Sequence, residues 1–579
     1  MAGLALAFSI MACSPTPQSA SQEPSEPSEQ ADTTGDISPA AHLQTIAPLP
    51  VETAPNALPG SGETTGAPAS ETAASETSGM PATSADGEPV IAPLTLSPAN
   101  PATPALTRFS FAQVREKAKA LAAKDYKAPA GAPKEASSLN YDQYRRIQFN
   151  DEAAIWPEGE HGYRVMLDPR GYLFNQEITI NLVEEGQVSP RPYRPEDFDF
   201  LDLPVPGKVR DTLGFAGFRV LTPLNQSGKF DEVISFRGAS FFRALGTGSV
   251  YGASSRGLGI GTASPEGEEF PYFTEFWLEK PKPGTEQVTL YALLDGPSVT
   301  GAFKFTVQPG VQTAVDVEAS FYPRREVNGI GLAPITSMYF FSPHDLRKQA
   351  NDFRPAVHDS EGLAIHMANG EWAWRPLVNP AALQVSALAG SVPRGFGLIQ
   401  RQRGFDAYSD FEAQYYHRPN VWIEPQSGWQ DGELMLVEIP TINEFNDNIV
   451  AFWRPENAWT KGNVYNVSYR MRWGLSSPAA STIAVKATRA GKTLDGKREI
   501  FVIDYDVPDA TMLEGAEPEI SSSAGEIKNA VIKRLPNSDK VRLSFELDAQ
   551  ATNVAELRAL LVRAGKPLTE TWLYRWRAE

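Results

Sequence analysis

Alternation of apolar and polar residues recurs along the chain from about Tyr163 onward. A period of two is typical of β-strands, because successive side chains point to opposite faces of a sheet. Segments with this pattern end at Pro, Gly or Asp turns and predict strands at residues 178–183, 218–224, 274–280, 288–295 and 301–308. The chain shows no regular alternation of strands and helices over these residues. We therefore expect an all-β fold, with a large N-terminal antiparallel β-sandwich over residues 107–455.

A helical period precedes these strands. Ser110 can cap a helix over residues 111–124, in which Phe111, Val114, Ala118 and Leu121 share one face. A second, shorter helix fits residues 138–149. These helices are the only ones that the pattern predicts before the strands begin.

A second set of short strands follows a connector after Trp453. VYNVSYRMRW alternates cleanly over residues 464–473, and further strands fit residues 498–506, 540–548, 557–565 and 571–578. We expect an immunoglobulin-like β-sandwich over residues 462–579. The cysteine pair of antibody domains is missing, so this likeness is one of architecture.

The first 106 residues differ from the rest in composition. Residues 1–13 form an apolar run that ends in small residues and Cys13, which resembles the end of a bacterial lipoprotein signal. The alternative is an apolar tail with an unreactive thiol. Residues 14–106 are rich in Pro, Ser, Thr and Glu, which predicts a disordered linker. The apolar run is too short to span a bilayer, so we expect membrane contact only through a lipid on Cys13.

Charge, cysteine content and missing motifs exclude several classes of function. The net charge of −18 argues against a nucleic-acid partner. The single cysteine excludes an intramolecular disulfide and a thiolate metal site. The six histidines show no metal-ligand spacing, and the chain has neither a GxSxG elbow nor a P-loop. We therefore expect no metal and no cofactor.

One stretch, from Pro355 to Trp453, concentrates the candidate chemistry. It holds Asp359, Asp410, Glu444 and Asp447 in turn-like settings among many aromatic residues and arginines. Aromatic faces can stack on sugar rings, and charged side chains can bind their hydroxyl groups. The composition of the stretch favours a polyhydroxylated ligand.

Many ordered runs resemble the periplasmic glucans biosynthesis proteins of the OpgG/OpgD (MdoG/MdoD) family. They are LGFAGFRV, SFRGASFFRA, YGASSRGLGI, EEFPYFTEFW, YALLDGPSVTGAFKF, GLAPITSMYFF, RPAVHDSEGL, NGEWAWRPL, RPNVWIEP and EIPTINEFNDNIVAFW. Their order is kept from about Phe109 to Tyr574. The resemblance implies a mutarotase-like large sandwich, a smaller immunoglobulin-like one, and a periplasmic role in building osmoregulated glucans with β-1,2-linked backbones.

The resemblance also implies roles for single residues. Asp447 falls at the position of a general acid and Asp359 at that of a general base, as in an inverting endo-glucanase or a transglycosylase. Glu444 would keep a proton on Asp447. Either Asp could instead be a turn former that bonds its own backbone.

The remaining candidates are substrate contacts. Asp410 is a rival carboxylate and more plausibly touches the substrate. Other expected contacts to sugar are Trp372, Trp374, Tyr415, Arg418 and Arg489. Aromatic residues at this density are more often core, and Arg489 lies in the second sandwich, where a solvated surface role is nearly as good an interpretation.

Two functions stay open at this point. The first is an enzyme that cleaves or transfers β-1,2-glucan in the periplasm of a Gram-negative bacterium. The second is a non-catalytic module that receives nascent glucan from a membrane synthase. A homodimer is compatible with both.

Overall fold

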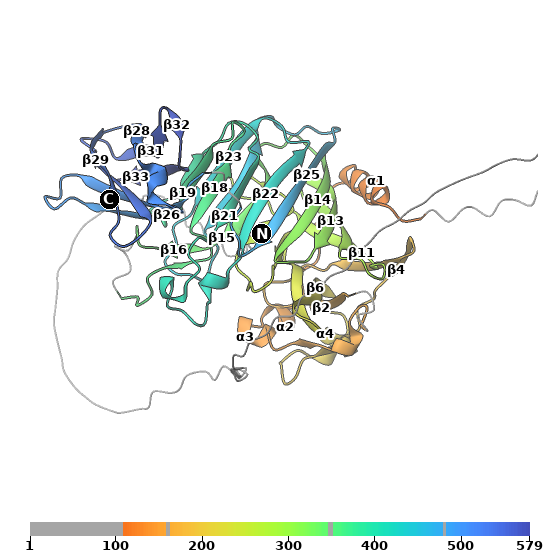
Figure 1. Cartoon of the computed structure of the whole chain (residues 1–579). Helices are drawn as coiled ribbons and strands as arrows, with labels where there is room; N and C mark the ends of the chain where they lie inside the picture. The colour runs from red at the N-terminus through yellow and green to blue at the C-terminus, as the bar shows by residue number, and fades with distance from the viewer. Residues whose placement is uncertain (1–107, 158–161, 346–350, 479–481, 579) are drawn as a thin grey trace, which may run out of the picture. The chain divides into compact units, whose positions relative to one another are not determined.

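The computed structural model describes residues 108–157, 162–345, 351–478 and 482–578. Cys13 and the linker over residues 14–106 lie outside these ranges. Strands dominate the described chain, which confirms the all-β prediction (Figure 1). The helices are α1 (Phe111–Ala122), α2 (Lys134–Ser137), α3 (Tyr141–Tyr144) and α4 (Gly207–Arg210), with 3₁₀ turns η1 (Asp151–Ala153), η2 (Pro195–Asp197), η4 (Phe405–Ala407), η5 (Tyr415–His417) and η6 (Ala510–Leu513).

The predicted first helix is confirmed. Helix α1 starts after Ser110, whose backbone N–H donates to the Gln113 side chain at 3.1 Å. Its buried residues Val114 and Ala118 pack on the large sheet. The second predicted helix is wrong in extent, because only Tyr141–Tyr144 is α-helical and residues 148–149 form a short strand.

One face of the large sandwich is a ten-stranded sheet. Its strands, in spatial order, are β2 (Arg164–Pro169), β6 (Phe215–Gln226), β7 (Lys229–Arg237), β8 (Phe241–Ala244), β9 (Ser254–Arg256), β15 (Ile330–Ser337), β24 (Ile449–Pro455), β23 (Gly432–Glu438) and β20 (Gln384–Ala387), with β10 (Gly259–Ile260) beside β15. All of its pairings are antiparallel.

The other large sheet has fifteen strands and continues into the C-terminal part. Its order is β28 (Glu517–Ser522), β31 (Val554–Arg563), β33 (Thr571–Arg577), β19 (Trp372–Pro376), β18 (Gly362–His366), β21 (Gly395–Ile399), β22 (Asn420–Ser427), β25 (Tyr465–Gly474), β14 (Gln312–Pro323), β13 (Val299–Gln308), β12 (Val288–Asp295), β11 (Tyr272–Glu279), β3 (Thr179–Glu184) and β4 (Gln187–Pro190), with β32 (Lys566–Pro567) beside β31. Two of its pairings, β3 with β11 and β19 with β33, are parallel.

The C-terminal sandwich adds a four-stranded sheet of its own. The order is β26 (Val485–Lys492), β27 (Glu499–Asp506), β30 (Lys540–Asp548) and β29 (Glu526–Arg534). A separate apolar core, which includes Phe501, Phe545 and Trp572, lies here. The remaining sheets of the described residues are two small ones, β1 (Gln148–Phe149) with β5 (Phe198–Asp199) and β16 (Tyr339–Phe341) with β17 (Val357–His358).

One strand was assigned to the wrong part of the chain. The alternating segment at residues 464–473 was expected to open the C-terminal sandwich, but β25 pairs with β14 and β22 in the large sheet (Figure 1). Alternation shows that a segment is a strand but does not identify its partners, which explains this error.

Candidate functional site

Asp359 and Asp447 are held at the ends of short irregular segments. Asp359 follows β17 directly, and its backbone N–H donates to the Met338 carbonyl at 2.8 Å. Asp447 lies just before β24. The charge of Asp447 raises the pKa of Asp359, so the two carboxyl groups are close enough to interact. The structure thus brings together the two carboxylates that the resemblance paired.

Asp359 is a buried carboxyl group with one ionic neighbour. Its Oδ1 lies 3.4 Å from Nε of Arg418 and has no hydrogen-bond partner among the described residues. Burial raises the pKa of Asp359 to about 6, and the charges of Asp447 and Glu444 add to this, while Arg418 and Arg243 oppose it. This carboxyl can gain or lose a proton near neutral pH.

Asp447 is less deeply buried than Asp359, with 24% of its side chain exposed against 9%. A guanidinium nitrogen of Arg243 lies 3.9 Å from its Oδ2. Burial raises the pKa of Asp447, whereas Arg243, Arg256 and Arg418 lower it. A raised pKa lets a carboxyl group keep a proton near neutral pH, as a general acid must, while its partner has to be ionised to act as the base.

The adjacent Asn448 bonds backbone groups of other segments. Asn448 is buried, accepts the Tyr339 N–H at 2.8 Å and donates to the Ile439 carbonyl at 3.0 Å. These bonds fix the backbone at the start of β24. The Asp447 carboxylate faces Arg243 instead of capping its own turn.

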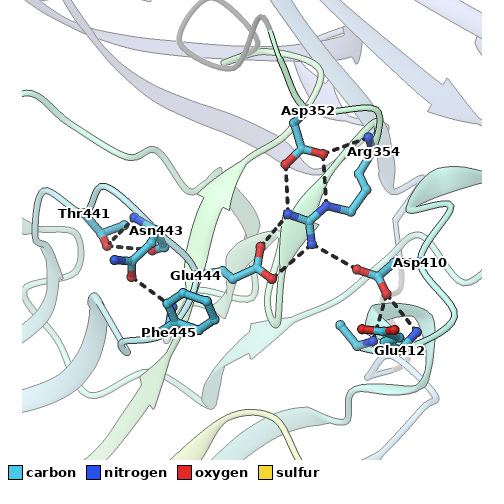
Figure 2. Close-up of polar contacts among 9 residues, drawn as sticks. Asp352, Arg354, Asp410, Glu412, Thr441, Asn443, Glu444 and Phe445 are labelled. Atoms are coloured by element: carbon cyan, nitrogen blue, oxygen red, sulfur yellow. Dashed lines mark hydrogen bonds and ion pairs between the residues drawn. The ribbon is translucent and has the colours of Figure 1, made fainter. Parts of the chain in front are cut away.

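Asp410 and Glu444 gather around Arg354 (Figure 2). Arg354 donates to Asp410 at 3.0 Å and to the two oxygens of Glu444 at 3.1 and 2.6 Å. Asp352 accepts two further bonds from the same guanidinium, at 3.0 and 2.8 Å. Glu444 was expected to raise the pKa of Asp447. Its charge instead raises the pKa of Asp359 and of Tyr415.

Asp410 also organises its own loop. It accepts the backbone N–H groups of Glu412 and Ala413 at 2.9 and 2.8 Å. Although burial opposes ionisation, these bonds and Arg354 lower the pKa of Asp410. A carboxylate held charged in this way is a poorer candidate for proton transfer than Asp359 or Asp447.

The three predicted aromatic contacts are buried side chains. Trp374 is only 2% exposed, with the Arg401 guanidinium 3.6 Å from its ring centroid, so it is a core residue. Trp372 stacks against both His366 and Trp422, at 4.3 and 5.7 Å between ring centroids. Tyr415 packs on Tyr408. The density of aromatic residues at these three positions therefore reflects packing in the core.

The two predicted arginine contacts differ in position. Arg418 pairs with Asp359 and donates to the carbonyls of Tyr251 and Ala413, which places it at the carboxylates. Arg489 pairs with Asp504 at 2.7 Å on the neighbouring strand β27. The structure therefore gives Arg489 a partner inside the C-terminal sandwich.

The histidine beside Asp359 is not a ligand or base. His358 is buried, and its Nδ1 lies 2.8 Å from the Gln400 amide oxygen. Burial lowers the pKa of His358 to about 3, so the ring is neutral and structural. Across residues 108–578, gaps aside, no three His, Cys, Asp or Glu side chains are grouped to bind a metal ion. Within the same residues, no helix has the length and apolar character needed to cross a membrane.

Sequence reasoning missed two arginines of the site. Arg243 and Arg354 lie in the runs FFRA and DFRP, where a charged residue follows phenylalanine directly. Arg243 contacts Asp447 from β8, and Arg354 contacts three acidic residues. A cation beside each predicted carboxylate was a reasonable expectation, but its position depends on which strands and loops meet.

Comparison with known proteins places the chain in a family. Residues 109–576 match the family described as "Periplasmic glucan biosynthesis protein, MdoG". The chain is 44% identical over 449 residues to glucans biosynthesis protein G of Vibrio cholerae, covering 77% of this chain and 82% of that protein. It is 42% identical over 511 residues to the protein of the same name from Shewanella sp. MR-7, covering 86% and 93%. The chain belongs to this periplasmic glucan biosynthesis family.

Proposed function

We propose that this protein acts on β-1,2-glucan as an inverting endo-glucanase or a transglycosylase. The observation that carries the proposal is the pair of interacting carboxyl groups, Asp359 and Asp447, whose pKa values burial raises. Family membership supports glucan as the substrate class. The names of the relatives state glucan biosynthesis and nothing finer.

In this proposal the two carboxyls divide the proton transfers. Asp447, protonated, donates to the glycosidic oxygen as the bond from that oxygen to the anomeric carbon breaks. Asp359, ionised, takes a proton from the attacking water. The water oxygen bonds to the anomeric carbon from the face opposite the leaving group. In a transfer reaction, a sugar hydroxyl replaces the water. Arg418 would then steady the ionised Asp359.

The test uses purified protein and linear β-1,2-glucan. We expect a change in product size, together with α-anomeric products in a time-resolved NMR spectrum if hydrolysis inverts. Linear β-1,3-glucan is the control and should be left unchanged. Binding without any new product would favour the non-catalytic module. If the protein neither binds the glucan nor converts it, the proposal is refuted.

The cellular setting is also proposed. The family description and the Cys13 run support a periplasmic protein of a Gram-negative bacterium, tethered by a lipid on Cys13. A membrane glucan synthase is the proposed donor, and a homodimer the proposed assembly. Cys13→Ser should move the protein from the membrane to the soluble fraction; a wild type that is already soluble would argue against the lipid.

A further inference from the structure

A single guanidinium connects three chain segments that lead to the site. Arg354 precedes Asp359 by five residues, and its partners Asp410 and Glu444 stand on the segments that reach Arg418 and Asp447. Figure 2 shows the three acidic side chains directed at Arg354 from separate segments. The cluster therefore ties the three segments to one another next to the carboxylates.

The same segments expose large apolar side chains. Phe353 is 81% exposed, Phe411 75%, Ile442 91% and Phe445 84%. Among the described residues only one other large apolar side chain, Leu494, is as exposed. Three of the four are phenylalanines that directly neighbour a member of the Arg354 cluster. Most of each ring is therefore open to contact with a ligand.

The surroundings of these rings indicate the kind of ligand. Along the sequence, each phenylalanine stands next to a charged member of the Arg354 cluster, so charged groups flank the apolar rings. A protein interface core is depleted in charged residues. A pyranose ring offers an apolar C–H face for stacking, and its hydroxyl groups can donate to Asp352, Asp410 or Glu444.

We propose that Phe353, Phe411 and Phe445 form an aromatic platform that binds glucose rings beside Asp359 and Asp447. Arg354 is the positioning residue of this platform. The inference rests on the proposed function, because it takes β-1,2-glucan as the ligand. It assigns the stacking role to exposed phenylalanines on loops, where the sequence suggested Trp372, Trp374 and Tyr415.

The planar guanidinium explains why arginine occupies position 354. Its five N–H donors in a rigid fork let one side chain bond Asp352, Asp410 and Glu444 together. A lysine ammonium has three donors and no planar fork.

The test measures glucan binding without turnover. Linear β-1,2-glucan is titrated calorimetrically into the Asp447→Asn protein, with or without added phenylalanine-to-alanine changes. We expect about tenfold weaker binding for Phe411→Ala or Phe445→Ala, and on the order of 100-fold for the triple variant that adds Phe353→Ala. Leu494→Ala, an equally exposed change in the C-terminal sandwich, should bind as the parent does.

The outcomes separate this inference from the proposed function. Because most of each ring is exposed, their removal should change the melting temperature little, although Phe411 contacts Phe405 at 4.4 Å between ring centroids. If the Asp447→Asn parent and the wild type both fail to bind glucan, the proposed function fails. If the parent binds and the triple variant binds equally well, the platform alone is refuted. A triple variant that keeps its glucan affinity but changes its sedimentation coefficient would identify the surface as a protein interface and also overturn the platform.

Discussion

Two charged clusters of this protein have opposite composition. Around Arg354, one guanidinium meets three carboxylates from three loop segments. Around Asp504, one buried carboxylate meets Arg489 and Arg542, on strands β26 and β30, which flank its own strand β27. The first cluster has excess negative charge and the second has excess positive charge.

The difference shows what ion pairs contribute in each setting. Strand register alone already places Arg542 opposite Asp504, so that cluster reinforces contacts that the sheet makes anyway. No sheet pairing aligns the loops around Arg354, and the ion pairs themselves join them. We infer that the loop cluster serves the site and the strand cluster serves stability.

The largest effect should come from removing the carboxyls of the site. Asp447→Asn and Asp359→Asn keep side-chain size but cannot exchange a proton, so each should lower turnover of β-1,2-glucan by roughly 100-fold or more. Product sizing with time gives the rates. Asp504→Asn is the matched control, with lower stability and unchanged turnover of the folded protein. Near wild-type rates in both site variants would shift the assignment to Asp410.

A second test uses pH, because the two clusters should respond with opposite sign. Burial raises the pKa of Asp359 from 3.8 to about 6, so its ionisation destabilises the fold as pH rises through that window. Arg542 and Arg489 outweigh burial and lower the pKa of Asp504, so its contribution is lost as pH falls through the folded value. Wild type should therefore lose stability from pH 4 to pH 7, and Asp359→Asn should not. The difference in free energy of unfolding, variant minus wild type, should rise by on the order of 2–3 kcal/mol over this interval.

The measurement is urea unfolding at pH 7, pH 4 and about pH 2. Because the folded pKa of Asp504 lies below 3.8, wild type should lose the stability that Asp504 contributes as pH falls below 4, and Asp504→Asn should lack this loss. Equal pH dependence in both variants would show that Asp359 is not buried as an ionisable group.

The sequence predicted the elements of this fold better than their partners. Strands such as β12 and β30 match the predicted residues 288–295 and 540–548 because period two is visible locally. The partners of β25 depend on residues far along the chain, which local periodicity does not encode. The helix expected at residues 138–149 was overestimated, since its apolar spacing also fits a turn followed by a strand.

The candidate site also has features that the sequence could predict and features that it could not. Family motifs selected Asp359 and Asp447 as candidates, but the density of aromatic residues could not separate the buried Trp374 from the exposed Phe445. Exposure is a property of the folded neighbourhood, and a tryptophan in a strand is usually core. The role of Arg354 required knowing that three distant segments meet.

The smallest expected effect comes from replacing one arginine by lysine in each cluster. This pair of variants also tests the comparison between the loop cluster and the strand cluster most directly. Arg354→Lys keeps the charge but cannot bridge three carboxylates, so the loops should lose their alignment. We expect kcat/KM on β-1,2-glucan to fall about tenfold, mainly through KM, because the stacking surface is displaced while Asp359 and Asp447 remain. Arg542→Lys should leave kcat/KM unchanged and lower stability by about 1 kcal/mol or less, since the pair is partly exposed. Hydrogen exchange should quicken over residues 405–418 in the first variant only. Equal kinetics in the two lysine variants would mean that the loop cluster, like the strand cluster, only adds stability.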